Sequence, residues 1–90
     1  MPLKNHQENK TDITQKYYNQ VLKINPNHSA ALNNLGAICR ELGENQKAKE
    51  FYEKAIEINP SYVDAHSNLG VIFKELEEYQ KAKDCYKKVI

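Results

Sequence analysis

Apolar side chains recur along this chain at intervals of three and four residues, which places them on one face of an α-helix. Five segments show the pattern. Their apolar positions are Tyr17, Tyr18, Val21 and Leu22; Ala31, Leu32, Leu35, Ile38, Cys39 and Leu42; Ala48, Phe51, Tyr52, Ala55 and Ile56; Ala65, Leu69, Ile72, Phe73 and Leu76; and Ala82, Cys85, Tyr86, Val89 and Ile90. The pattern predicts five helices and an all-α fold.

The pattern also repeats at a longer interval of 34 residues, which separates Pro26 from Pro60. When residues 26–56 are compared with residues 60–90, 16 of the 31 positions are identical. A period of roughly 20 to 50 residues is typical of arrays in which one supersecondary unit stacks on the next. The sequence therefore predicts a stack of similar helix pairs.

Four segments follow from this period. A polar tail at 1–10 is predicted to be mobile, a half repeat at 11–26 holds a single helix, one repeat occupies 27–60, and a truncated repeat occupies 61–90. The chain is thus predicted to hold about two and a half repeats.

The turns between helices carry their own signals. Gly43 can adopt the left-handed conformation that ends a helix, and a short link makes the two flanking helices antiparallel. Glu77 stands one period later, so the second turn is predicted to be strained or differently shaped. Ser61 and Asp64 have the spacing of a capping box that opens the fourth helix.

Two glycines, Gly36 and Gly70, lie inside helices at equal phase of the repeat. A glycine there costs roughly 1 kcal/mol relative to alanine. The sequence therefore predicts that two helix backbones approach closely at each glycine, with Ala48 and Ala82 as the small partners.

A helix pair of this length with these residues resembles the tetratricopeptide repeat (TPR). The motif residues are Leu35, Gly36, Gly43, Ala48, Tyr52, Ala55 and Pro60, then Leu69, Gly70, Phe73, Tyr79, Ala82 and Tyr86. The sequence departs from the motif at Leu32 and His66, where a bulky aromatic is common, and at Glu77 and Val89. The resemblance implies an α-solenoid of antiparallel helix pairs in a right-handed superhelix, with the first helices on its concave side. It also implies a module that binds a peptide or partner protein without catalysis.

Within this family, the segments "LNNLG" and "HSNLG" are similar to the repeats of protein O-GlcNAc transferases and related scaffolds. There the asparagine before Leu-Gly lines the inner groove. The clamp for chaperone C-termini is matched only at Asn34 and Asn68. Ala30 and Asp64 stand where that clamp has basic residues, so chaperone binding is not predicted.

A peptide groove is predicted on the first helices, opposite their apolar stripes. Its residues are Asn33, Asn34, Ala37 and Arg40, then Ser67, Asn68, Val71 and Lys74 one period later. Asparagine amides both donate and accept hydrogen bonds, so Asn34 and Asn68 would grip a peptide backbone above Ala37 and Val71. Arg40 and Lys74 would favour acidic groups. Two alternatives stay open: the asparagines only bridge neighbouring repeats, and the two cations are solvated.

Composition argues against several other function classes. The formal net charge of +1 provides no bulk field for nucleic acid or an anionic membrane. We find no Ser/His/Asp grouping and no glycine-rich phosphate loop, so no enzyme and no cofactor are predicted. Cys39 and Cys85 lack metal-ligand spacing, so no metal site is predicted. Unpaired cysteines without a secretory signal favour a reducing compartment, which predicts a cytoplasmic location.

Self-association is an alternative to peptide binding. The last helix would leave Tyr86, Val89 and Ile90 partly uncovered, and terminal repeats normally need a polar outer face. Two and a half repeats also fall below the usual minimum of about three. The chain is therefore predicted to be a fragment of a larger scaffold or multidomain enzyme, and to dimerise through its end faces or be marginally stable.

Overall fold

The structure, a computed structural model, describes the backbone of residues 2–89 and the side chains of residues 11–89. Its helices are α1 (Pro2–Ile24), α2 (Ser29–Glu41), α3 (Asn45–Ile58), α4 (Val63–Glu75) and α5 (Tyr79–Val89). The prediction of five helices is confirmed over the described residues. No helix of this part of the chain is long and apolar enough to cross a membrane.

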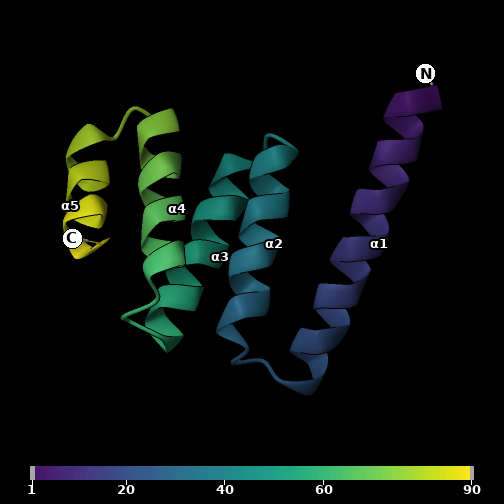
Figure 1. The fold of residues 1–90 in the computed structure, drawn as a ribbon, viewed down its shortest axis with the longest axis horizontal. Helices are drawn as coiled ribbons and strands as arrows, with labels where there is room; N and C mark the ends of the chain where they lie inside the picture. Colours follow the sequence, from purple (N-terminus) through teal and green to yellow (C-terminus); the bar gives the residue numbers. More distant parts are fainter. Residues whose placement is uncertain (1, 90) are drawn as a thin grey trace.

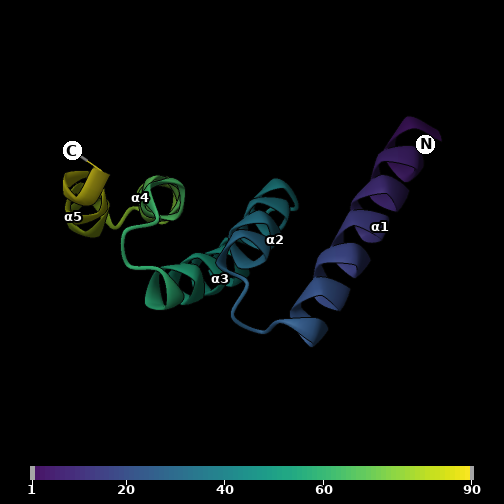
Figure 2. The ribbon, with the colours of Figure 1, turned by 60° about the horizontal axis from the view of Figure 1, so that its bottom comes forward.

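The helices form two stacked hairpins preceded by a single helix (Figure 1). The hairpins are α2 with α3 and α4 with α5, and α4 packs against both helices of the first hairpin. The assembly is only 18 Å thick along its shortest axis, which corresponds to two layers of helices. In Figure 1 α1 leans away from α2 toward its N-terminal end, and Figure 2 shows α1 at the end of the row of helices. Among the described helices, α1 contacts α2.

The hydrophobic core runs through both hairpins and joins them. The larger cluster contains the buried residues Cys39, Ala48, Tyr52, Leu69, Ile72, Phe73, Ala82 and Cys85. A smaller cluster contains Leu32, Ala55 and Ala65. All of these residues belong to the apolar stripes predicted from the sequence. Leu42, predicted on the same stripe, is the C-cap residue of α2 and is 44 % exposed.

The two helical glycines make room for tyrosine rings. A Cβ atom at Gly36 would lie 2.6 Å from Cε1 of Tyr52, and one at Gly70 would lie 2.7 Å from Cε1 of Tyr86. Each ring belongs to the second helix of the same hairpin. The prediction that each glycine lets two helix backbones approach closely is therefore wrong. Each glycine instead accommodates a tyrosine side chain of the facing helix.

The turns of the two hairpins have the same shape despite their different residues. Gly43 has φ 78° and Glu77 has φ 63°, both left-handed. The Glu77 amide donates to the Lys74 carbonyl at 3.0 Å and the Glu78 amide donates to the Phe73 carbonyl at 2.7 Å, while the Gly43 turn has the same two bonds at 3.0 and 2.8 Å. This is the Schellman pattern of a helix C-terminus. The sequence predicted that the second turn is either strained or differently shaped, and the prediction of a different shape is wrong. The left-handed conformation of Glu77 supports the prediction of backbone strain, because such a conformation is uncommon for a residue other than glycine.

The helix starts depart from the sequence prediction. The capping box expected at Ser61 does not form, because the N-cap of α4 falls at Tyr62 and has no side-chain cap bond. The Ser61 hydroxyl instead donates to Oδ1 of Asn59 at 3.3 Å. At α2 the N-cap is His28, whose Nδ1 accepts the backbone N–H of Ala31 at 3.1 Å.

The N-terminal segment differs from its predicted boundary. The sequence division set residues 1–10 apart as a tail, whereas α1 already begins at Pro2. Proline is favoured in the first turn of a helix, and residues 3–24 contain neither proline nor glycine to end it. Met1 lies outside the described residues, and the predicted mobility of this segment stays a prediction.

Candidate binding surface on α2 and α4

The predicted groove residues lie on two helices that contact each other, α2 and α4. We call the surface formed by these eight residues the inner surface: Asn33, Asn34, Ala37, Arg40, Ser67, Asn68, Val71 and Lys74. Asn33 is buried, Arg40 and Lys74 are exposed, and the other five are half-buried. The structure thus brings the two predicted groups together side by side.

The asparagines of this surface bridge neighbouring helices. Nδ2 of Asn68 donates to Oδ1 of Asn33 at 3.1 Å, which links α4 to α2. Nδ2 of Asn34 donates to the Tyr18 hydroxyl at 3.1 Å, which links α2 to α1. Bridging, one of the two roles left open by the sequence, is therefore present. Oδ1 of Asn34 and Oδ1 of Asn68 have no hydrogen-bond partner among the described residues, so each amide retains an acceptor.

An ion pair forms a further bridge on this surface. Nε of Arg40 lies 3.2 Å from Oε1 of Glu75, and the two side chains are 43 % and 39 % exposed. A pair this exposed contributes about 0–1 kcal/mol to stability. Its main consequence is electrostatic, because it engages Arg40 and leaves Lys74 as the cation of this surface that pairs with no described carboxylate.

Ala37 and Val71 form the apolar part of the inner surface. They occupy equal phases of the repeat on α2 and α4, and both are half-buried. With about 100° between successive residues of a helix, Ser67, Val71 and Lys74 share one stripe of α4. The stripe therefore offers a hydroxyl, an apolar contact and a charge in succession.

The sequence did not identify the partners of these side chains. Tyr18 was recognised as an apolar stripe residue, but its hydroxyl fixes Asn34. Glu75 lies on the same face of its helix but was not among the predicted groove residues, although its carboxylate pairs with Arg40 of α2. Repeat phase was the available signal in both cases, but phase alone does not say which of two neighbouring helices a side chain meets.

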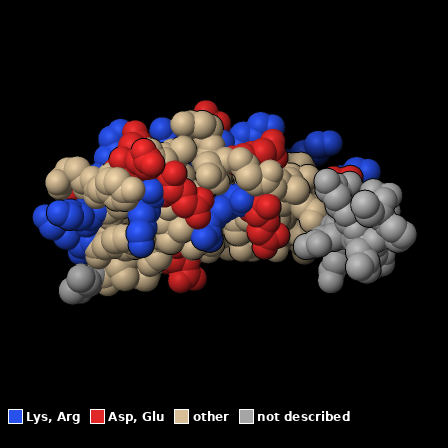
Figure 3. All heavy atoms as spheres, turned by 90° about the horizontal axis from the view of Figure 1, so that it is seen from above, with Lys and Arg blue, Asp and Glu red and all other residues tan. Residues whose placement is uncertain are grey.

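The surrounding surface carries mixed charges. Figure 3 shows Lys and Arg side chains interspersed with Asp and Glu on one face of the molecule. Two ion pairs at equal phase, Lys47 with Glu44 at 3.3 Å and Lys81 with Glu78 at 3.6 Å, contribute to this pattern. Among residues 11–89 no group of three His, Cys, Asp or Glu side chains could hold a metal ion.

Both cysteines are free and buried. Burial raises the pKa of the Cys39 thiol and of the Cys85 thiol. Because the thiolate is the reactive form, neither environment activates its sulfur as a nucleophile. The inner surface itself offers hydrogen bonding, apolar contact and positive charge.

The residues predicted for self-association are only partly exposed where the structure describes them. Tyr86 and Val89 are half-buried, and Ile90 lies outside the described residues. The large apolar side chains with the greatest exposure lie on α1 instead, where Ile13 is 68 % and Tyr17 is 61 % exposed. Tyr17 was part of a predicted stripe, whereas Ile13 fell outside it.

Comparison with known families identifies the repeat. The tetratricopeptide repeat matches residues 29–62 and 63–90, which together make up more than half of the chain. The chain belongs to the tetratricopeptide repeat family, whose members are generally protein-interaction modules.

Similar solved structures agree with this assignment. MamA superimposes with a TM-score of 0.85 and 25 % identity, over 94 % of this chain and 50 % of MamA. YrrB, described as a TPR protein with an unusual peptide-binding site, gives 0.77 and 25 %, over 80 % of this chain and 37 % of YrrB. The second TPR of Spaghetti (RPAP3), bound to an HSP90 peptide, gives 0.84 and 18 %, over 93 % of this chain and 78 % of that chain. Because the match covers 50 % of MamA, this chain spans about half the length of that protein. A comparison with curated proteins gave no match.

Proposed function

We propose that this chain binds an extended peptide of a partner protein along the inner surface, without catalysis. One observation carries the proposal. Asn34 and Asn68 each use their amide nitrogen within the protein and keep Oδ1 unpaired among the described residues, beside the half-buried Ala37 and Val71. An extended peptide presents N–H groups that need such acceptors and apolar side chains that need such a floor.

The similar structures support this role in general terms. YrrB is a TPR protein with a peptide-binding site, and it shares this fold at 25 % identity. Spaghetti shares the fold alone, at 18 % identity. We do not expect this chain to bind the HSP90 peptide, because Ala30 and Asp64 stand where basic residues are expected in a carboxylate clamp. Lys74 nevertheless gives the inner surface a preference for an acidic group.

A steric variant tests the proposal. Binders selected from a peptide array are titrated against Val71→Arg, which fills the floor between the helices, and against Lys54→Ala, an exposed change on α3. We expect Val71→Arg to weaken binding by about tenfold or more, equivalent to about 1.4 kcal/mol, while Lys54→Ala retains wild-type affinity. Thermal unfolding checks that both variants fold. Unchanged binding by a folded Val71→Arg protein would exclude the inner surface.

The amide variants test the hydrogen-bonding part. Asn34→Ala and Asn68→Ala each remove one acceptor, so we expect each to weaken peptide binding by about threefold to tenfold. If the double variant binds as tightly as the wild type, the amides serve only to bridge the helices.

Self-association remains the second candidate function, and the exposure of Ile13 and Tyr17 favours it. Exposed apolar side chains that gather on one helix face suit an interaction site. Light scattering at several protein concentrations tests it, since a dimer would raise the measured mass as concentration increases. A constant monomer mass at high concentration would remove this candidate.

A further inference from the structure

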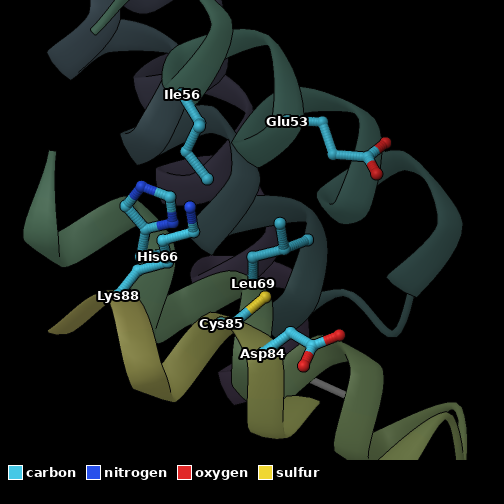
Figure 4. A pocket seen from close by; sticks show the side chains of 7 residues that line it. All are labelled: Glu53, Ile56, His66, Leu69, Asp84, Cys85 and Lys88. Atoms are coloured by element: carbon cyan, nitrogen blue, oxygen red, sulfur yellow. The ribbon is translucent and has the colours of Figure 1, made fainter. Parts of the chain in front are cut away.

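A cavity of about 220 Å³ opens between α3 and α5, away from the inner surface. Three helices contribute its walls: Glu53 and Ile56 from α3, His66 and Leu69 from α4, and Asp84, Cys85 and Lys88 from α5 (Figure 4). Helical geometry puts His66 and Leu69 on the side of α4 opposite the stripe of Ser67 and Val71. The cavity and the inner surface therefore lie on different sides of the molecule.

The floor of this cavity is apolar and firmly held. Leu69 is 6 % and Cys85 is 8 % exposed, and both belong to the main core cluster. The His66 ring is fixed because its Nε2 donates to the Pro60 carbonyl at 2.8 Å. An apolar cavity of about 150 Å³ is enough to hold benzene. This cavity is therefore large enough for one aliphatic or aromatic side chain.

The mouth of the cavity carries opposite charges at its two ends. In Figure 4 the carboxylates of Glu53 and Asp84 lie toward one end, and Lys88 lies with His66 toward the other. None of the three charged side chains forms an ion pair with another described residue, although Oδ1 of Asp84 accepts a bond of 3.3 Å from Gln80. Burial raises the pKa of the Cys85 thiol, and the charges of Asp84 and Glu53 raise it further. The field of these two carboxylates thus reaches the floor.

The seam between α1 and the first hairpin offers a contrast. A second cavity of about 300 Å³ lies between α1, α2 and α3, and four of its residues precede residues of the first cavity by one repeat. These pairs are Asn19 and Glu53, Leu35 and Leu69, Glu50 and Asp84, and Phe51 and Cys85. Stacking therefore creates a hollow at each seam. At the second seam, Cys85 stands in place of Phe51 on the floor, and Glu53 in place of Asn19 adds a second acid to Asp84.

We propose that the cavity between α3 and α5 is a second docking site, which receives one apolar side chain of a partner protein segment carrying an adjacent lysine or arginine. The apolar side chain enters between Ile56, Leu69 and Cys85, and the cation pairs with Glu53 and Asp84. Lys88 at the opposite end repels a second basic residue there, which gives the bound segment a preferred direction. This site is separate from the proposed peptide binding on the inner surface.

Three capped hexapeptides test the site by NMR titration of the labelled full chain. The parent peptide has the sequence Gly-Gly-Lys-Leu-Gly-Glu, the second has glutamate in place of lysine, and the third has glycine in place of leucine. We expect the parent to shift the amide signals of Ile56, Leu69 and Cys85. The acidic peptide is expected to bind about tenfold more weakly, and the glycine peptide to lose binding. Equal binding of the three peptides would overturn the proposal.

Two protein variants locate the binding. Cys85→Phe introduces the residue that the first repeat has at the same phase, and it should fill the cavity and abolish shifts by the parent peptide. The double variant Glu53→Lys with Asp84→Lys should weaken the parent by about tenfold and improve the acidic peptide, without altering the core. If the folded double variant still prefers the parent peptide, or if folded Cys85→Phe binds it normally, the cavity is not the site.

Val71→Arg separates this proposal from the proposed function. It blocks the inner surface and leaves the cavity intact, so the parent hexapeptide should bind it with wild-type affinity. Loss of that binding, or parent-induced shifts confined to Ala37 and Val71, would assign the peptide to the inner surface and overturn the second site.

Discussion

The hairpins α2–α3 and α4–α5 have the same fold but differ in what they leave open at their turns and seams. Both stack a tyrosine ring on a glycine, and both end their first helix with the same hydrogen-bonded turn. They differ at Gly43 against Glu77 in the turn and at Phe51 against Cys85 at the seam. The glycine–tyrosine contact and the hydrogen bonds of the turn are thus repeated, whereas the left-handed turn residue and one residue beside the seam cavity differ.

The glycine contacts give the largest expected difference between the hairpins. Gly36→Ala would place Cβ within 3.0 Å of three atoms of the fully buried Tyr52 ring, which cannot move aside. Overpacking costs about 1–3 kcal/mol, and a contact of 2.6 Å with a fully buried ring belongs at the upper end of that range. Because the helix gains about 1 kcal/mol from alanine, we expect a net loss of about 2 kcal/mol. Tyr86 is half-buried and can tilt away, so Gly70→Ala should change stability by less than about 0.5 kcal/mol.

Urea denaturation of both variants measures this contrast through the free energy of unfolding. Equal losses in the two variants would show that the second ring is held as firmly as the first, against its greater exposure.

The two amide bridges provide the next contrast. Asn68→Ala leaves Oδ1 of Asn33, a residue only 7 % exposed, without its donor, which should cost about 1–3 kcal/mol. Asn34→Ala removes a bond to Tyr18 in a half-buried setting where water can replace the donor, so about 0.5–1 kcal/mol is expected. Chemical denaturation measures both. A larger loss for Asn34→Ala would reverse the inferred order of the bridges.

Exchanging the turn residues tests the strain at Glu77. Glu77→Gly relieves a left-handed backbone at a non-glycine residue and should stabilise the protein by about 1 kcal/mol. Gly43→Ala should destabilise it by a similar amount, about 1 kcal/mol, and by conformation alone, because a Cβ there would have no neighbour within 4 Å. Thermal unfolding of the pair is the measurement. Loss of stability in Glu77→Gly would mean that the glutamate side chain stabilises the turn.

We expect the smallest effect from alkaline pH, which should lower the stability of both hairpins. Burial raises the pKa of Cys39 and of Cys85 above the ordinary value of 9.0, and it raises the pKa of Tyr52 above 10.0. A raised folded-state pKa contributes stability that is complete below the unfolded pKa and is lost as pH rises through the folded value. Stability should therefore stay level up to about pH 9 and fall above it.

The variant Cys39→Ala with Cys85→Ala is the control for this pH profile. It should reduce the decline above pH 9 and leave the part caused by Tyr52. An identical pH profile in this variant would show that the buried thiols do not contribute to the decline.

Much of the fold followed from the sequence, because its signals are local and repeated. The 34-residue period and the three- and four-residue spacing of Leu35, Ile38 and Cys39 predicted stacked helical hairpins, and those residues are in the core. Helix ends were less predictable. The cap of α4 falls at Tyr62 rather than Ser61, and α1 begins at Pro2, because the local preferences that set helix ends are weak.

The candidate sites divide in the same way. The sequence alone determined that Asn34 and Ala37, and one repeat later Asn68 and Val71, share one face of successive first helices, because helical periodicity fixes which residues share a face. Only the tertiary structure decided that the asparagines bridge helices, that Arg40 pairs with Glu75, and that a cavity opens beside Cys85. These features depend on distances between residues far apart in the chain, which the rotation and spacing of packed helices set and no local pattern encodes.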